Sequence, residues 1–212
     1  QADISEQQAL DLFLHATHAG IFEFNWGVLC PNCYAFVTTP GGLRAIESRA
    51  HCDICSIEFE VVIDDNVEVA FTVSPSVRRI RFHDLNSLDL QRDWINVFYS
   101  PSRFVDSPLV RDQVKTLMIS SCHLEDSQRT HLDLHLETDA RYLVITPRQH
   151  AIANVYAVTG ETTQQVDFDI FDGRFVPELV SVAPGDVTLN FQNRTGGAIN
   201  IGVVLDPKTF QP

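Results

Sequence analysis

Two pairs of cysteines, each with two residues between them, constrain the fold of this chain more than any other feature. The first pair is Cys30 and Cys33, the second is Cys52 and Cys55, and 18 residues lie between the pairs. Two turns of this kind present four thiolates to one tetrahedral ion. We therefore predict that these four cysteines bind a structural zinc ion in a zinc ribbon. A closed shell of four sulfurs leaves no coordination position for substrate, so we expect no catalysis at this site.

Disulfide bonds are the alternative use of the four cysteines. Disulfide bonds within each pair would close small, strained rings. Disulfide bonds between the two pairs would avoid this strain and remain an alternative. Zinc thiolates predict a reducing compartment and a cytoplasmic location, while disulfides would predict a secreted protein. We expect His51, directly before Cys52, to lie near the ion but outside its ligand shell.

Charge and hydropathy exclude several classes of protein. The 212 residues include 15 basic and 28 acidic side chains, and the net charge of −13 opposes binding to nucleic acid. With 44% apolar residues the chain can bury a core, yet no apolar run reaches the roughly 20 residues that cross a bilayer. The chain begins at Gln1, so we expect that a leader was removed or that a longer polypeptide precedes it.

The residue patterns of the N-terminal segments predict a helix and a hairpin. Residues 5–19 carry apolar side chains at helical spacing, with Ser5 as the N-cap and Gly20 as the stop. His15 and His18 share one side of this helix, where we expect solvated side chains rather than metal ligands. Residues 57–75 alternate on both sides of an Asp-Asp-Asn break, which predicts a β-hairpin attached to the ribbon.

The only basic cluster of the sequence occupies residues 77–83. We expect Arg79 and Arg81, on one strand face, to pair with acidic groups and to fix how two parts of the molecule dock. Arg78 belongs to the same cluster, and an anion or nucleotide site is the alternative interpretation. Residues 86–112 are rich in turn formers and predict a connector with short helices or strands at most.

From about residue 113 the sequence is dense in short strands. Regular turns separate apolar runs, which predicts a mainly β fold whose C-terminal part is an antiparallel sandwich. Residues 130–137 alternate strictly, so we expect the leucines to face a core and four polar residues to form the wet face of a sheet rather than a metal site: His131, Asp133, His135 and Glu137. The predicted domains are residues 1–85, the connector 86–112 and the sandwich 113–212.

No catalytic motif is found in the sequence. Cys122 precedes His123, but neighbours on a strand face opposite ways, so we expect a buried thiol rather than a nucleophile. Nucleophile elbows, phosphate loops and dinucleotide fingerprints are missing. The chain is predicted not to be an enzyme, since no motif supports catalysis by residues 78–83, His131 or His135.

Residues 172–195, DGRFVPELVSVAPGDVTLNFQNRT, resemble the corresponding part of cupredoxin-like sandwiches. A blue-copper site needs two histidines, a cysteine and usually a methionine. No histidine follows His150 and the only methionine is Met118. The resemblance therefore implies a cupredoxin-like fold without copper.

Two further segments, ALDLFLHATHAGIFEFNWGVLCPNC and AHCDICSIEFEVVIDDNVEVAFTVSPSVRRIRF, carry a second resemblance. With Asn25-Trp26 before the first cysteine pair and Pro75 and Arg78 after the second, residues 5–85 resemble the N-terminal domain that precedes the catalytic region in some bacterial class III adenylate/guanylate cyclases. The resemblance implies a regulatory module that communicates with a cyclase dimer. The cyclase catalytic region itself is missing from these 212 residues.

Together these features predict a non-catalytic, zinc-stabilised regulatory or protein-interaction module. Its partner would be another protein, a second copy or a cyclase catalytic domain, with neither nucleic acid nor a membrane span involved. The alternative is a secreted, self-assembling β-protein whose cysteines form disulfides and whose sheet edges join copies.

Overall fold

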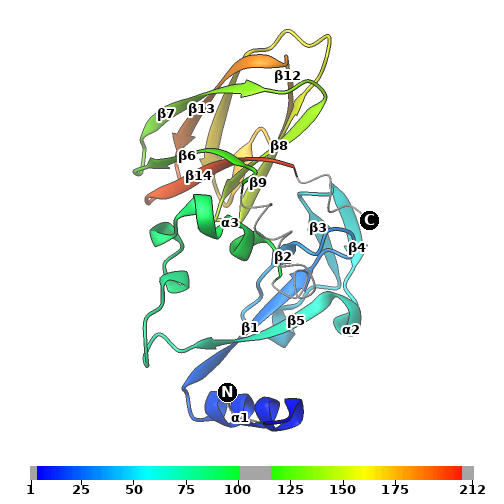
Figure 1. Ribbon diagram of the computed structural model, residues 1–212, viewed down its shortest axis with the longest axis vertical. Helices are drawn as coiled ribbons and strands as arrows, with labels where there is room; N and C mark the ends of the chain where they lie inside the picture. Colours follow the sequence, from blue (N-terminus) through cyan, green and yellow to red (C-terminus); the bar gives the residue numbers. More distant parts are fainter. Residues whose placement is uncertain (1–3, 101–115, 207–212) are drawn as a thin grey trace.

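The computed structural model describes residues 4–100 and 116–206 (Figure 1). Its N-terminal part contains the helix α1 (Glu6–His18), the strands β1 (Phe22–Leu29), β2 (Phe36–Thr38), β3 (Arg49–Cys52), β4 (Ile57–Glu60) and β5 (Val67–Val73), a 3-10 turn η1 (Leu43–Ala45) and a short helix α2 (Ile63–Asn66). β1 lies between β2 and β5 in one small antiparallel sheet, and β3 pairs with β4 in another. Cys30 directly follows β1, and Cys52 is the last residue of β3.

The predicted N-terminal helix is confirmed with its capping signals. The Ser5 side chain accepts a hydrogen bond from the backbone N–H of Gln8, whose side chain accepts one from the backbone of Ser5. Gly20, with φ +76°, ends the helical segment. No residue of α1 is buried, and its contact with the sheet includes Phe13, whose ring lies 5.1 Å from that of Phe71 on β5.

The predicted hairpin over residues 57–75 is wrong. The expected break at residues 64–66 forms the helical turn α2, in which Asn66 accepts a hydrogen bond from the backbone N–H of Val62. This turn separates the two strands, so β4 pairs with β3 and β5 pairs with β1. Alternation indicates which face of a strand is buried but does not select its partner.

The described part of the expected connector contains a helix that is packed on one side. Two 3-10 turns, η2 (Arg81–His83) and η3 (Leu85–Ser87), lead to α3 (Leu90–Phe98), in which Trp94, Ile95 and Phe98 are each 1% exposed. The predicted domain boundaries remain a prediction, and residues 101–112 of the connector lie outside the described residues.

The basic cluster is not a strand, contrary to expectation. Arg81 lies in η2 and pairs with Asp93 at 3.1 Å, and Arg92 binds the other oxygen of the same buried carboxylate. Arg78 and Arg79 form no ion pair within the described part of the chain. Since Arg81 and Asp93 both belong to the segment between β5 and the sandwich, this pair orders that segment rather than docking two domains.

Two sheets form the C-terminal sandwich, which confirms the predicted mainly β fold. Its strands are β6 (Met118–Leu124), β7 (Arg129–Leu136), β8 (Ala140–Thr146), β9 (Ala151–Ala157), β10 (Gln165–Phe171), β11 (Arg174–Val176), β12 (Leu179–Val182), β13 (Gly185–Asn193) and β14 (Ile199–Leu205). The sheet orders are β12-β9-β8-β14-β6 and β11-β10-β13-β7. Most pairs are antiparallel as predicted, but β10–β13 and β12–β9 are parallel. Turn residues mark where strands end, not which sheet the next strand joins.

The core of the sandwich lies between its two sheets. Phe168, Phe175 and Phe191 of the four-stranded sheet are at most 1% exposed and pack against aliphatic residues of the other sheet. Leu132, Leu134 and Leu136 contribute to this core, as the alternation of residues 130–137 predicts.

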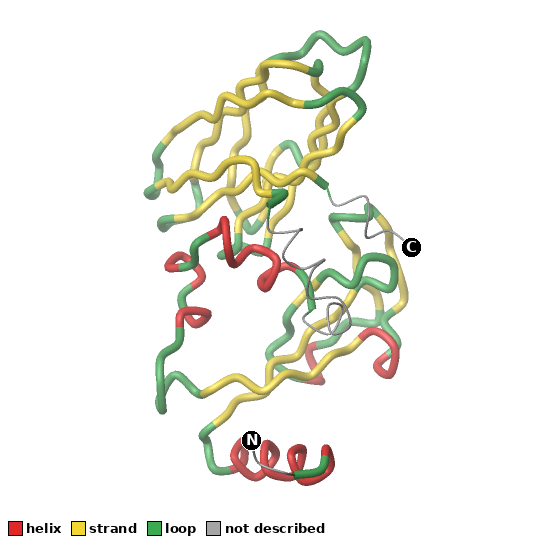
Figure 2. Tube along the Cα trace, viewed as in Figure 1, coloured by secondary structure: helices red, strands yellow, loops and turns green. Residues whose placement is uncertain are grey.

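A second core covers the outer face of the five-stranded sheet. It joins Leu143, Ile145, Ile152 and Val204 of the sandwich to Trp94, Ile95 and Phe98 of α3, and to Cys30, Cys33, Cys52 and Ile54. Figure 2 shows α3 between the sandwich and the small N-terminal sheets. The cysteines are therefore part of the packing that joins the two halves of the molecule.

None of the described helices is both long and apolar enough to span a membrane.

Candidate metal centre

The same backbone turn presents both cysteine pairs. The backbone N–H of Tyr34 donates to the carbonyl of Cys30 at 2.9 Å, and that of Ser56 donates to the carbonyl of Cys52 at 2.7 Å. Tyr34 and Ser56 each follow the second cysteine of a pair, and both have positive φ, 59° and 54°. This left-handed residue turns the chain back and aims both sulfurs of a pair to one side.

The structure brings the four predicted residues together as a possible metal site. All four Sγ atoms lie within 4.8 Å of one another. The Sγ atoms of Cys33 and Cys52 are 3.7 Å apart, close to the roughly 3.8 Å edge of a tetrahedron with Zn–S bonds of about 2.3 Å. All five cysteines of the chain are free. The donor set and its spacing fit zinc better than the disulfide alternative.

Hydrogen bonds among the four sulfurs shift their pKa values in opposite directions, lowering those of Cys30 and Cys55 and raising those of Cys33 and Cys52. Hydrogen bonds among the sulfurs, with Cys33 the largest contributor, lower the pKa of Cys30, and the same sharing raises the pKa of Cys33. Asn32 Nδ2 donates to Cys55 Sγ and the backbone N–H of Cys55 donates to Cys52 Sγ, both at 3.4 Å. Four buried thiolates would repel one another strongly without a cation, so a divalent ion would complete this charge arrangement.

His51 lies outside the cluster, as predicted. Its Nε2 is 3.8 Å from Asp53 Oδ1, and its side chain is half exposed. Across residues 4–100 and 116–206, the four cysteines are the one group of three or more His, Cys, Asp or Glu side chains with ligand atoms close enough to share a metal ion.

Two sandwich residues hold the second cysteine turn, and sequence reasoning missed both. Asn154 Nδ2 on β9 donates to the carbonyl of Asp53 at 3.0 Å, and Arg141 on β8 donates to the carbonyl of Ile54. Arg141 Nε also donates to Asn154 Oδ1 at 3.0 Å, and its guanidinium pairs with the nearly buried Asp206 at 3.3 Å. The sandwich thus contacts the metal centre through main-chain carbonyls of the turn.

A comparison with protein families assigns the chain. Residues 1–211 match the family described as "Family of unknown function (DUF5939)". The chain belongs to the DUF5939 family. No curated protein and no solved structure matches it. The family description gives neither an activity nor a ligand.

The other candidate histidines of this DUF5939 chain lie apart on the surface. His15 and His18 are exposed on α1, and His15 Nδ1 contacts the Asp11 carbonyl at 2.7 Å. On the sandwich, His131 and His135 are exposed and pair with Asp133 and Asp186. The polar side chains of residues 131–137 therefore lie on the solvent-exposed face of the sheet, as predicted.

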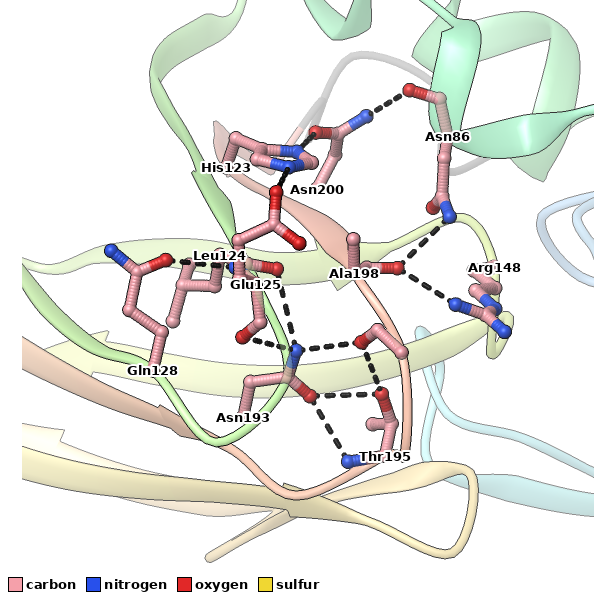
Figure 3. Close-up of polar contacts among 11 residues, drawn as sticks. Asn86, His123, Leu124, Glu125, Gln128, Arg148, Asn193, Thr195, Ala198 and Asn200 are labelled. Atoms are coloured by element: carbon pink, nitrogen blue, oxygen red, sulfur yellow. Dashed lines mark hydrogen bonds and ion pairs between the residues drawn. The ribbon is translucent and has the colours of Figure 1, made fainter.

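Cys122 and His123 do not form a nucleophilic pair. Cys122 packs against the sandwich core, and burial raises its pKa to about 11. His123 lies on the other face of β6, where its ring contacts Asn200 Oδ1 at 2.8 Å and Glu125 Oε1 at 3.3 Å (Figure 3). A thiol with a raised pKa and no base beside it is a poor nucleophile.

Asn154→Ala tests the contact between sandwich and metal centre. The variant leaves the part-buried carbonyl of Asp53 without the Asn154 donor, so we expect the free energy of unfolding to fall by about 1–3 kcal/mol. Urea denaturation followed by circular dichroism measures the change. Asn190→Ala is the matched control, because Asn190 bonds only Asp167 on an exposed face; an equal loss in both variants would contradict the contact's role.

We expect His150 to make the stability of the fold depend on pH. Its ring stacks on Phe98 at 4.8 Å and its Nε2 lies 2.7 Å from the carbonyl of Phe36, to which it donates. Burial lowers the pKa of His150, opposed by the bond to Phe36 and by the charge of Asp53. With a folded pKa below the unfolded value of about 6.5, the unfolded chain takes up the proton first as the pH falls.

The resulting prediction concerns stability between pH 7 and pH 5. We expect the free energy of unfolding to decline as the pH falls below about 6.5, and the decline to shrink in His150→Asn. Urea titrations of both proteins across this range give the difference curve, in which shared carboxylate effects cancel. Parallel pH profiles for the two proteins would refute the assignment.

Proposed function

We propose that this DUF5939 chain is a non-catalytic, zinc-stabilised regulatory or protein-interaction module that acts with a bacterial nucleotide cyclase. One observation carries the proposal: the four clustered cysteines lie in the core that joins the N-terminal sheets, α3 and the sandwich. Bound there, zinc would supply folding energy and would fix the N-terminal part against the sandwich. A shell of four sulfurs has no place for substrate, which supports a structural ion.

An apolar N-terminal surface supports a protein partner. On α1, Leu12 is 61% exposed, and Leu10 and Leu14 are more than 40% exposed. Phe24 on β1 and Val69 on β5 add to the same end of the molecule. Exposed apolar patches of this kind mark interaction sites. The resemblance of residues 5–85 to a domain preceding cyclase catalytic regions supports a cyclase as that partner.

The metal and the compartment are tested together by native mass spectrometry. One zinc ion per chain with four reduced cysteines supports the proposal and a reducing, cytoplasmic location. A mass lower by two units per cysteine pair, with no metal, would instead support the secreted disulfide protein.

The regulatory role needs a separate measurement. A bacterial class III cyclase catalytic region is assayed for cyclic nucleotide formation with and without the zinc-loaded chain, either added or fused at its N-terminal side. We expect the rate to change several-fold. An unchanged rate in both arrangements would overturn the cyclase association and leave the metal site unaffected.

A further inference from the structure

A cleft opens where the β1–β5 sheet, α3 and the turn between β8 and β9 meet. Its volume is about 450 Å³, and its walls include the aromatic rings of Trp26, Phe36 and Phe82. A second hollow of about 360 Å³ adjoins it and shares Leu85 and Arg148 with it. Both volumes are typical of small-molecule binding sites, which combine apolar walls with a few polar groups.

Arg148 supplies a positive charge at the junction of the two hollows. Figure 3 shows the side chains of Arg148 and Asn86 converging on the carbonyl of Ala198, to which both donate at 2.9 Å. Arg148 forms no ion pair in the described part of the chain, although the protein carries a net charge of −13. Asp84, on the same hollow, accepts the backbone N–H of Asn86 instead. The guanidinium therefore keeps donors for an anion.

His83 and Asn86 line the second hollow, and each carries one buried polar atom that lacks a partner among the described residues. His83 Nδ1 accepts the backbone N–H of Ile80 at 3.2 Å, so its Nε2 carries the proton, and this buried donor has no acceptor among the described residues. Asn86 Nδ2 donates to the carbonyl of Ala198, while the buried Oδ1 of Asn86 has no donor among the described residues. Buried polar groups are almost always hydrogen-bonded. An occupant that reaches these two atoms would offer an acceptor to His83 and a donor to Asn86.

Two glycines make room for the groups that line the cleft. A Cβ atom at Gly27 would overlap the ring of Phe36, and a Cβ atom at Gly197 would overlap the guanidinium of Arg148. Neither glycine has a positive φ, so close approach rather than backbone conformation requires them. Phe36 and Arg148 therefore each lie close against a glycine.

We propose that this cleft binds a small molecule in which a planar aromatic ring system is joined to a phosphate or carboxylate. The rings lie against Trp26, Phe36 and Phe82, and the anion accepts from Arg148 and His83. A hydroxyl group beside the anion, such as that of a ribose, donates to Asn86 Oδ1. The inference deepens the proposed regulatory role by naming a ligand class, and binding to the chain alone can fail without affecting the metal or cyclase experiments.

Calorimetric titration of the zinc-loaded chain with four probes tests the site. Adenosine monophosphate and indole-3-acetate carry rings and an anion, adenosine carries rings alone, and inorganic phosphate carries an anion alone. We expect at least one of the two ring-bearing anions to bind with a Kd below about 1 mM, at least tenfold more tightly than adenosine or phosphate. Which of them binds distinguishes a phosphate from a carboxylate ligand.

Variants place the ligand in the cleft. Arg148→Gln should weaken binding of the anion at least tenfold, and Gly197→Ala should weaken it by displacing the same guanidinium while keeping its charge. Arg129→Gln is the control, because Arg129 bonds Gln192 on the outer face of the sandwich. Melting temperatures near that of the parent protein establish that the variants fold. Binding of neither ring-bearing anion, or an affinity that Arg148→Gln leaves unchanged, would overturn the proposal.

Discussion

Cys52→Ser is expected to abolish stoichiometric zinc binding and to unfold the N-terminal sheets around the cysteine turns. Structural zinc in small domains contributes an apparent 10–16 kcal/mol, roughly as much as the whole stability of a domain, about 5–15 kcal/mol. Cys52 is 2% exposed and belongs to the second core, so its loss also removes packing from α3. Zinc content by mass spectrometry and thermal melting by circular dichroism measure both effects.

Cys122→Ala is the matched control for that experiment. It removes another thiol that packs against a core but lies outside the cluster, so zinc content should stay the same and stability should fall by about 1 kcal/mol. A chelator should reproduce the effect of Cys52→Ser on the parent protein. Melting that is unchanged after complete loss of zinc would show that the ion has no structural role.

Trp94→Ala is expected to produce the second large effect. Trp94 is 1% exposed, packs edge-on against Tyr99 at 6.1 Å, and lies in the core between the cysteine turns and the sandwich. Removing so large a buried side chain leaves a cavity and costs about 3–5 kcal/mol. Denaturation in urea, followed by circular dichroism, measures the loss.

Leu12→Ala provides the comparison for Trp94→Ala. Leu12 is 61% exposed on α1, so its truncation should change stability by less than about 0.5 kcal/mol. A loss below about 1 kcal/mol for Trp94→Ala would mean that α3 does not hold the two halves together. The Trp94 Nε1 atom has no hydrogen-bond partner among the described residues, so the expected cost comes from packing alone.

Local patterns in the sequence predicted the features of the fold that depend on residues close together in the chain. The spacing of the cysteines predicted the cluster, the Ser5 cap predicted the start of α1, and turn residues predicted most strands of the sandwich. Each of these signals acts within a few residues: a turn aims two sulfurs, a cap satisfies a backbone donor, and alternation divides two faces.

Long-range pairing could not be predicted in the same way. Arg141 reaches a carbonyl 87 residues away and Asn154 one that is 101 residues away, and nothing in the local pattern of β8 or β9 marks these contacts. The turn formers of residues 86–112 predicted a connector with short helices or strands at most, and nothing local indicated that α3 packs into a core. Asp93 is nonetheless buried, since two arginines compensate its charge.

The helix α1 packs weakly on the rest of the protein, so its hydrogen exchange should respond to molecules that cover it. Phe13 stacks on Phe22 and Phe71, yet no side chain of the helix is buried. Backbone amides there should exchange with deuterium faster than those of the sandwich, because lifting this helix breaks few apolar contacts. If these amides exchange more slowly in cell extract than in buffer, another molecule covers α1 in the extract.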